Sequence, residues 1–310
     1  MKKYFYLIII LFLGLFYLGC TRNNTAVQQS STALKVALKS QESASAMLDM
    51  MSDQSNTAEA KERIDPSTNV DIQKYIGVEK INIEEAKEEL ESAQTDLFEF
   101  AQHKSKKNQT KVLEKAHKAV KESSERLRIL EEKTKVIVDF LGSETFSKSE
   151  IGAFFRPGEF HLIKEQVKEA RRLFNPVVEK LNVFAGRYKD QFAGLKGEII
   201  VTGYSDATAV EKGSALYRDL SGKLLEDDQV SQPSQQDLNQ KLSELRALAV
   251  KWLLVEIIKQ RKKDDSALIN INVRVLGRGE KLPRDLPENT AKNDPRRRAV
   301  TFYSVVLPLI

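Results

Sequence analysis

An acidic residue and an arginine in the last third of the chain are the residues best suited to binding chemistry. Asp206 closes the turn Gly203-Tyr204-Ser205-Asp206, directly after a predicted strand, and Arg246 lies on a predicted helix with Asn239 and Ser243. Asn239, Ser243 and Arg246 are spaced four and three residues apart, so they share one helical face. A guanidinium binds a carboxylate through two parallel hydrogen bonds, and a carboxylate binds an ammonium group. An acid and an arginine a few ångströms apart therefore suit a ligand that carries both charges, although isolated residues of these types more often form surface ion pairs.

Alternating strands and helices must position these residues. Hydrophobic patterning predicts strands over residues 151–155, 198–202, 268–276 and 299–306, and helices over 161–191, bent at Pro176, and 235–260. Ser234 and Asp237 supply the capping signal of the second helix. Its neighbouring face carries Leu238, Leu242, Leu245 and Ala249, which are expected to pack on a sheet. The order predicts an α/β sandwich with helices on one face of the sheet.

Four segments in a fixed order carry a resemblance to a known family. They are Gly203-Tyr204-Ser205-Asp206, the run from Asn239 to Val250, Gly277-Arg278-Gly279-Glu280 with Pro283, and Arg296-Arg297-Arg298. In this order they resemble the OmpA-like peptidoglycan-binding domain of outer membrane protein A, the peptidoglycan-associated lipoprotein and flagellar stator proteins. The resemblance covers residues 145–310.

The resemblance implies a βαβαβ domain with a mixed sheet that binds peptidoglycan non-covalently. It also implies that Asp206 and Arg246 hold the diamino acid of the wall peptide, which is diaminopimelate, ornithine or lysine. Asn239 and Arg297 or Arg298 line the same pocket in the family, and Ser243 completes the candidate set on the helical face. No cofactor is implied.

Three departures from the family pattern concern the same site. Ser205 replaces a threonine but keeps a hydroxyl, and Arg296 stands where asparagine is usual. Residues 207–238 form a segment longer than the family link between the acid and the helix. That insertion is expected to be a lid, a surface that recognises further wall chemistry, or a solvated loop, of which the loop is the commonest outcome.

The N-terminus reads as a lipoprotein signal over residues 1–19. Lys2 and Lys3 precede an apolar run from Tyr4 to Leu18, which is short for a membrane span, and Leu18-Gly19-Cys20 resembles a lipobox despite Tyr17. Cys20 is the single cysteine, and lipidation of its thiol is the expected role. The alternative is an uncleaved anchor with an incidental cysteine. No aspartate follows Cys20, which favours the outer membrane, facing the periplasm.

Helical patterns fill the region between the signal and the motifs. Residues 20–31 are polar and predict a lipidated, flexible tether, and residues 32–142 predict a helical spacer. Within it, an alanine-rich helix over 32–51 is followed by a break around Pro66. Asn82 with Glu85 predicts a capped helix start, and two heptad stripes ending at Gly142 predict an antiparallel hairpin or coiled coil. The hairpin is expected to be a spacer, with a partner-binding surface as the alternative.

Composition and motifs exclude several classes. The net charge of +5 falls to +3 without Lys2 and Lys3, which gives no case for nucleic acid. One cysteine excludes an internal disulfide and a cysteine-based metal cluster. We expect no enzyme, because no nucleophile–base pair, carboxylate dyad or metal set is found. A stator would need an acid in its membrane helix, which Tyr4–Leu18 lacks. The sequence thus predicts a lipoprotein that links a membrane to peptidoglycan; a helical scaffold or adhesin anchored by the same domain is the alternative.

Overall fold

The structure is a computed structural model that describes residues 23–103, 108–143, 146, 149–151, 155–188, 195–264, 269–284 and 286–308. The candidate signal segment and Cys20 lie outside the described residues. Two compact units divide the chain: one comprises Met1–Met47 and Val78–Leu130, the other Leu48–Gly77 and Glu131–Ile310. None of the helices in the described ranges combines the length and the apolar content that crossing a membrane requires.

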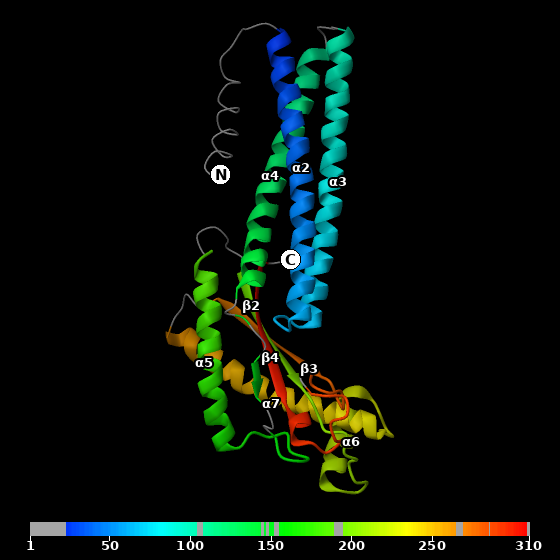
Figure 1. The fold of residues 1–310 in the computed structure, drawn as a ribbon, viewed down its shortest axis with the longest axis vertical. Coiled ribbons are helices and arrows are strands. Elements are labelled where there is room, and N and C mark those ends of the chain that lie inside the picture. The colour runs from blue at the N-terminus through cyan, green and yellow to red at the C-terminus, as the bar shows by residue number, and fades with distance from the viewer. Residues whose placement is uncertain are drawn as a thin grey trace. The chain divides into compact units, whose positions relative to one another are not determined.

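Three long helices make up the region expected to be a spacer: α2 (Asn23–Ala60), α3 (Pro66–His103) and α4 (Gln109–Gly142), seen in Figure 1. All three contribute to the apolar core of the first unit, which contains Leu34 and Ala37 of α2, Leu90, Ala93 and Leu97 of α3, and Ala116 and Ala119 of α4. Gln41 donates a buried hydrogen bond of 2.8 Å to Ser123 across this core. The helical content is confirmed, and the predicted alanine-rich helix packs with the two helices that follow it in one core.

Two helix boundaries differ from the sequence prediction. The segment 20–31, expected to be flexible, is helical from Asn23, and Val27 packs against the core of the first unit. Asn82 is not a helix start, because α3 begins at Pro66, where Asp65 accepts hydrogen bonds from the backbone of Ser67 and Thr68. Packing of an apolar face stabilises a helix more than its local propensities do, so continuous burial along α2 and α3 overrides these local signals.

The second unit contains a four-stranded mixed sheet. Its strands are β1 (Ser149–Ile151), β2 (Leu195–Gly203), β3 (Asn270–Gly277) and β4 (Val300–Pro308), in the spatial order β1-β4-β2-β3. β2 pairs in parallel with β3 and antiparallel with β4, and β1 pairs antiparallel with β4. The expected mixed α/β fold is confirmed at this level, with strand ends shifted by a few residues.

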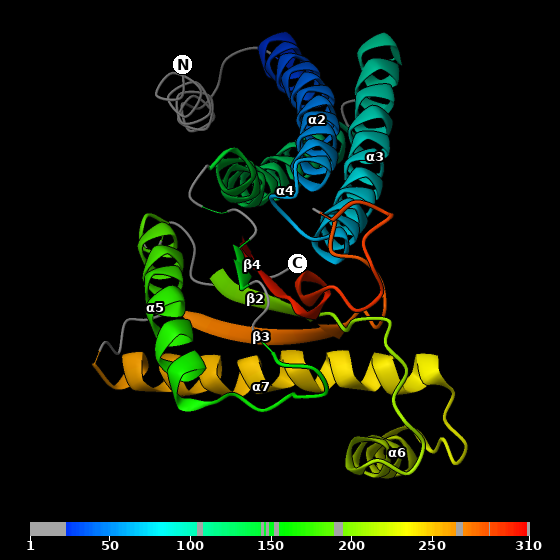
Figure 2. The same ribbon diagram turned by 60° about the horizontal axis from the view of Figure 1, so that its bottom comes forward.

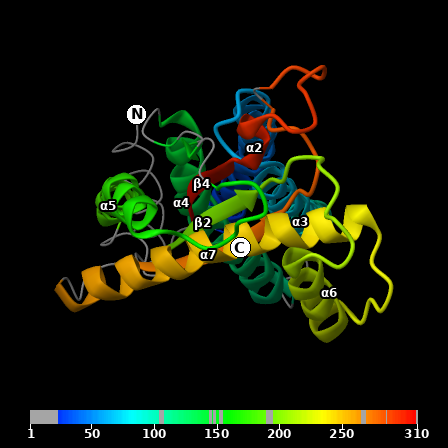
Figure 3. The same ribbon diagram turned by 90° about the horizontal axis from the view of Figure 1, so that it is seen from below.

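Helices α5 (Lys164–Gly186) and α7 (Gln235–Asp264) cover one face of the sheet, as Figure 2 shows. The rings of Phe174 on α5 and Phe302 on β4 meet edge to face, with centroids 4.9 Å apart. Pro176 lies inside α5, where a bend was expected. The insertion 207–238 is not a simple loop. It contains α6 (Ala215–Asp228), capped by Ser214, and α6 lies beside the first half of α7 (Figure 3).

The opposite face of the sheet meets residues from the ends of the long helices that belong to the same unit. Arg274 of β3 binds Glu198 of β2 at 3.1 Å and lies 3.8 Å from Asp71 of α3. Tyr188 donates a hydrogen bond to Asp139 of α4. The compact unit that holds the sheet comprises Leu48–Gly77 and the residues from Glu131 onward; the domain start expected at residue 145 stays a prediction.

Candidate functional site

Two glycines let α7 approach the sheet closely enough to place the candidate residues. Gly203 of β2 and Gly277 of β3 face each other in register at the carboxyl ends of their strands. A Cβ atom on Gly203 would overlap the carbonyl oxygen of Ser243, and one on Gly277 would overlap the side chain of Glu244. Side chains at these strand positions would push the helix outward. The glycines therefore fix where the Arg246 face of α7 meets the strand ends.

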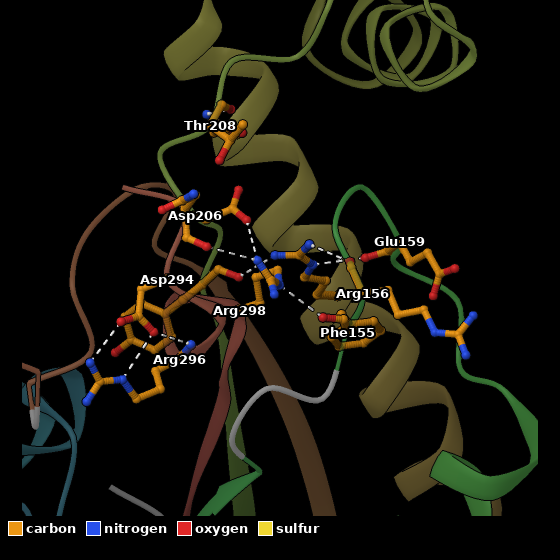
Figure 4. Close-up of polar contacts among 12 residues, drawn as sticks. Phe155, Arg156, Glu159, Asp206, Thr208, Asp294, Arg296 and Arg298 are labelled. Carbon is orange, nitrogen blue, oxygen red and sulfur yellow. Dashed lines mark hydrogen bonds and ion pairs between the residues drawn. The ribbon is translucent and has the colours of Figure 1, made fainter. Parts of the chain in front are cut away.

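Asp206 lies just past the end of β2, where it pairs with Arg298. The Asp206 Oδ2 atom accepts a hydrogen bond of 2.9 Å from Arg298, and each side chain is only 10% exposed. Figure 4 shows the two side chains pointing toward each other. Arg298 ends the short 3₁₀ helix η2 (Pro295–Arg298), whose first turn is capped by Asp294. The capping carboxylate binds Arg296, and these contacts lower the pKa of Asp294 to about 2.

Arg246 is fully buried and binds backbone oxygens. Its guanidinium donates to the carbonyl oxygens of Tyr204 and Glu159, both at 3.0 Å, and to that of Arg156 at 3.4 Å. Burial lowers the pKa of Arg246 to about 10, while the negative charge of Asp206 opposes that shift and the positive charge of Arg298 adds to it. A pKa of about 10 leaves the side chain charged at neutral pH. The site therefore contains one carboxylate beside two guanidinium groups.

Asn239 and Arg297 converge on the turn that follows β3. Asn239 donates 2.7 Å to the carboxylate of Glu280 and 3.2 Å to the carbonyl of Thr208. Arg297 donates to the backbone oxygens of Glu280 and Thr290, at 3.3 and 2.8 Å. Gly279 adopts a positive φ of 56° in this turn, a conformation that glycine accommodates without strain. The turn thereby joins the helix face to the Arg296–Arg298 segment.

Three buried polar atoms around this turn have no hydrogen-bond partner among the described residues: Ser205 Oγ, Asn239 Oδ1 and Arg297 Nε. Each residue also binds the turn through another atom, since the backbone of Ser205 donates to Gly279, and Asn239 and Arg297 contact Glu280. Buried polar atoms normally bind protein, water or a ligand. Donor and acceptor capacity is thus left available beside Asp206.

The structure brings five of the six predicted site residues into one polar group and gives the sixth another role. Ser243 donates to the Gln240 carbonyl and accepts from the Gly279 amide at 2.8 Å, so its hydroxyl anchors the turn. Sequence reasoning missed Glu280 as a contributor, although it was quoted as part of a motif. It also missed the segment 155–160, for which the Pro157-Gly158 turn was the available signal.

Metal chemistry finds no support in the described ranges, where no group of three or more histidine, cysteine, aspartate or glutamate side chains is placed to hold an ion. The Asp206 carboxylate has positive neighbours, and the one other acid in the group, Glu280, binds an amide. Paired cationic and anionic side chains of this kind bind a polar or zwitterionic ligand by hydrogen bonds and ion pairs.

Comparison with known proteins found no matching family model, no matching curated protein and no matching solved structure.

Proposed function

We propose that this protein is an envelope lipoprotein whose second unit is an OmpA-like domain that binds the diamino acid of peptidoglycan without covalent bonds. One observation carries the proposal: at the carboxyl end of β2, Asp206 contacts Arg298 and also lies close enough to Arg246 that its charge opposes the lowering of the Arg246 pKa by burial. A carboxylate beside two guanidinium groups offers complementary charges to one ammonium and one carboxylate.

Binding on this proposal exchanges internal contacts for ligand contacts. The ligand ammonium binds Asp206, and the ligand carboxylate binds an arginine through the planar fork. The unpartnered atoms of Ser205, Asn239 and Arg297 then supply hydrogen bonds to the polar backbone of the wall peptide. Asp206, Arg246 and Arg298 are buried, so charge-assisted contacts to them are worth more than they would be on an open surface.

Co-sedimentation of the purified full chain with isolated sacculi tests the proposal. Loss of a buried charge-assisted contact costs about 2–4 kcal/mol, so Asp206→Ala should weaken binding by roughly 30-fold to 1000-fold. The matched control is Glu211→Ala, which removes an exposed acid from the segment that follows Asp206 and should bind as wild type does. Thermal melts establish that both variants are folded.

A pair of soluble ligands makes the test specific to charge. A muropeptide with free diaminopimelate should compete with sacculi, and the same muropeptide with that carboxylate amidated should compete at least tenfold more weakly. Folded Asp206→Ala protein that sediments as well as wild type would refute the site. Equal competition by the two ligands would refute recognition of the zwitterion.

Attachment to the outer membrane through Cys20 is a separate part of the proposal. It rests on the basic residues, the short apolar run and the single cysteine of the N-terminal sequence. Cells fed radiolabelled palmitate should label the wild-type protein and leave Cys20→Ser unlabelled, still carrying its signal segment. Equal label in both proteins would rule out lipidation at Cys20 and leave the wall-binding proposal untouched.

A further inference from the structure

The segment 155–160, which we call the strap, occupies both arginines of the candidate site. Its Phe155 carbonyl accepts a hydrogen bond of 3.2 Å from Arg298. Its Arg156 and Glu159 carbonyls accept from Arg246 at 3.4 and 3.0 Å. Figure 4 shows Phe155, Arg156 and Glu159 along one stretch of chain beside the Asp206–Arg298 pair. The three hydrogen bonds of Arg246 described above thus all go to neutral backbone oxygens, while Arg298 divides its donors between backbone oxygens and the Asp206 carboxylate.

A tight turn makes the strap a stiff unit. Glu159 donates its amide to the Arg156 carbonyl at 3.1 Å, and Gly158 has a φ of 71°. Proline followed by glycine at the two central positions, with the second at positive φ, is typical of a type II turn. Proline fixes the backbone φ angle at the first central position, so the turn restricts how the Arg156 and Glu159 carbonyls lie relative to each other.

The insertion holds the strap in place. Phe160, at the end of the strap, is 7% exposed and packs in one apolar cluster with Leu220 and Leu224 of α6. A Cβ atom on Gly158 would lie 3.2 Å from Leu216 of α6, so the turn rests directly on that helix. The base of the insertion is itself fixed, because Gln235 donates to and accepts from the backbone of Val210 at 2.9 and 2.7 Å.

A ligand carboxylate is a stronger partner for a guanidinium than a neutral carbonyl. Arg246 nevertheless has no exposed surface while the Arg156 and Glu159 carbonyls bind it. Exchange of partners at Arg246 therefore requires the strap to leave. The apparent affinity of such a site is lowered by the fraction of molecules whose strap is displaced.

We propose that the strap is a gate over Arg246 and that the insertion, through α6, is the latch that keeps the gate closed. The proposal rests on the proposed function for the identity of the ligand, but the movement of the gate belongs to the ligand-free protein. It assigns a role to the 207–238 insertion: its contacts with Phe160 and Gly158 set how often the arginine becomes available.

Chemical modification of the ligand-free full chain tests the gate directly. Phenylglyoxal reacts with accessible arginines, and peptide mass spectrometry reports the rate at Arg246. Phe160→Ala removes the ring through which the strap joins the apolar cluster of the latch, so it should raise the Arg246 rate by at least about tenfold, as a shift toward the open state. Leu224→Ala, which changes only the latch, should act in the same direction and provides a second variant if Phe160→Ala does not fold.

The matched control is Phe174→Ala, which removes a buried ring from α5 against the sheet, away from the strap. It reports on any general loosening of the domain. Rates for the strap and latch variants that stay within twofold of the Phe174→Ala rate would overturn the gate. Rates at least tenfold above that control support it.

Titration with the diaminopimelate muropeptide separates the two proposals. With a gate, Phe160→Ala should bind the muropeptide more tightly or faster than wild type, because less free energy is spent on opening. Weaker binding by folded Phe160→Ala would overturn the gate and show that the strap is a fixed wall of the pocket. Absence of binding by wild type and variants alike, with the Arg246 rates still raised, refutes the proposed function and leaves the gate standing.

Discussion

Replacing Arg246 tests whether a buried arginine holds this part of the fold together. Its three hydrogen bonds to Tyr204, Arg156 and Glu159 join the end of β2 to the strap. Hydrogen bonds from a charged donor contribute about 1.5–3 kcal/mol each, and the cost of burying the guanidinium offsets several kcal/mol of that sum. Two of the freed carbonyls lie on the strap, where water can replace the lost donor. We therefore expect Arg246→Ala to lower the free energy of unfolding by about 3 kcal/mol.

Arg246→Lys should cost less, at about 1–2 kcal/mol, because an ammonium keeps the charge but cannot reach three carbonyls in one plane. Urea unfolding of the full chain, followed by circular dichroism, measures both changes. The matched control is Arg172→Ala, which removes an exposed arginine from α5 and should stay within about 0.5 kcal/mol of wild type.

An Arg246→Ala protein as stable as Arg172→Ala would refute the reasoning, because three lost hydrogen bonds would then have no energetic consequence. The outcome also bears on binding measurements at this position. Loss of sacculus binding by Arg246→Ala can be interpreted only for the folded fraction of the protein. Asp206→Ala is the simpler test of binding, because the Asp206 side chain joins fewer segments of the chain.

For three further substitutions we predict the direction in which stability changes, as measured by thermal melts. Burial raises the pKa of Glu198 in the folded protein. The folded state is therefore less stable with Glu198 charged, and this loss begins at about pH 4.3, where the side chain ionises in the unfolded chain. As the pH rises from 4 to 7, Glu198→Gln should therefore gain stability relative to wild type. A stability difference between the two proteins that does not change with pH would contradict this. Gly203→Ala should lower the melting temperature by at least about 8 °C through overlap with Ser243, where Gly222→Ala on α6, in open space, should not. Lys241→Met removes the partner of Asp227 and Asp228, both at 2.8 Å. It should destabilise at pH 7 and less near pH 3, and an equal loss at both would exclude charge as the cause.

The order of elements in the second unit could be predicted from local patterns, whereas the candidate site residues came from the order of four motifs. Short apolar segments located β2 and β4, and the Ser234–Asp237 signal located the start of α7, where the Ser234 hydroxyl does accept from the Asp237 amide. The spacing of Asn239, Ser243 and Arg246 correctly placed them on one face of that helix. Hydrophobic periodicity depends only on residues that are close together in the sequence, so it can be recognised before any tertiary contact is known.

Long-range contacts account for what the sequence did not reveal. Arg246 lies off the apolar stripe of α7, so its role in the fold was not visible, and two of its three acceptors come from residues nearly ninety positions earlier in the chain. The strap binds the two arginines through backbone carbonyl oxygens. Since every residue has such an oxygen, no residue type in the sequence marks this segment. The helix that contains Leu34 and Ala37 was predicted, but its partners were not, because these residues pack with α3 and α4 residues that lie far later in the sequence.

The position of β4 in the sheet has a consequence for the order in which the chain folds. β4 is the last strand in the sequence, but it lies between β1 and β2 in space. Until residues 300–308 are available, β1 has no strand to pair with and β2 lacks its antiparallel neighbour. Pairing between such distant segments is slow because the connecting loop must close first. A chain interrupted before Val300 therefore lacks the centre of its sheet, and folding of this unit is deferred until residues 300–308 have emerged.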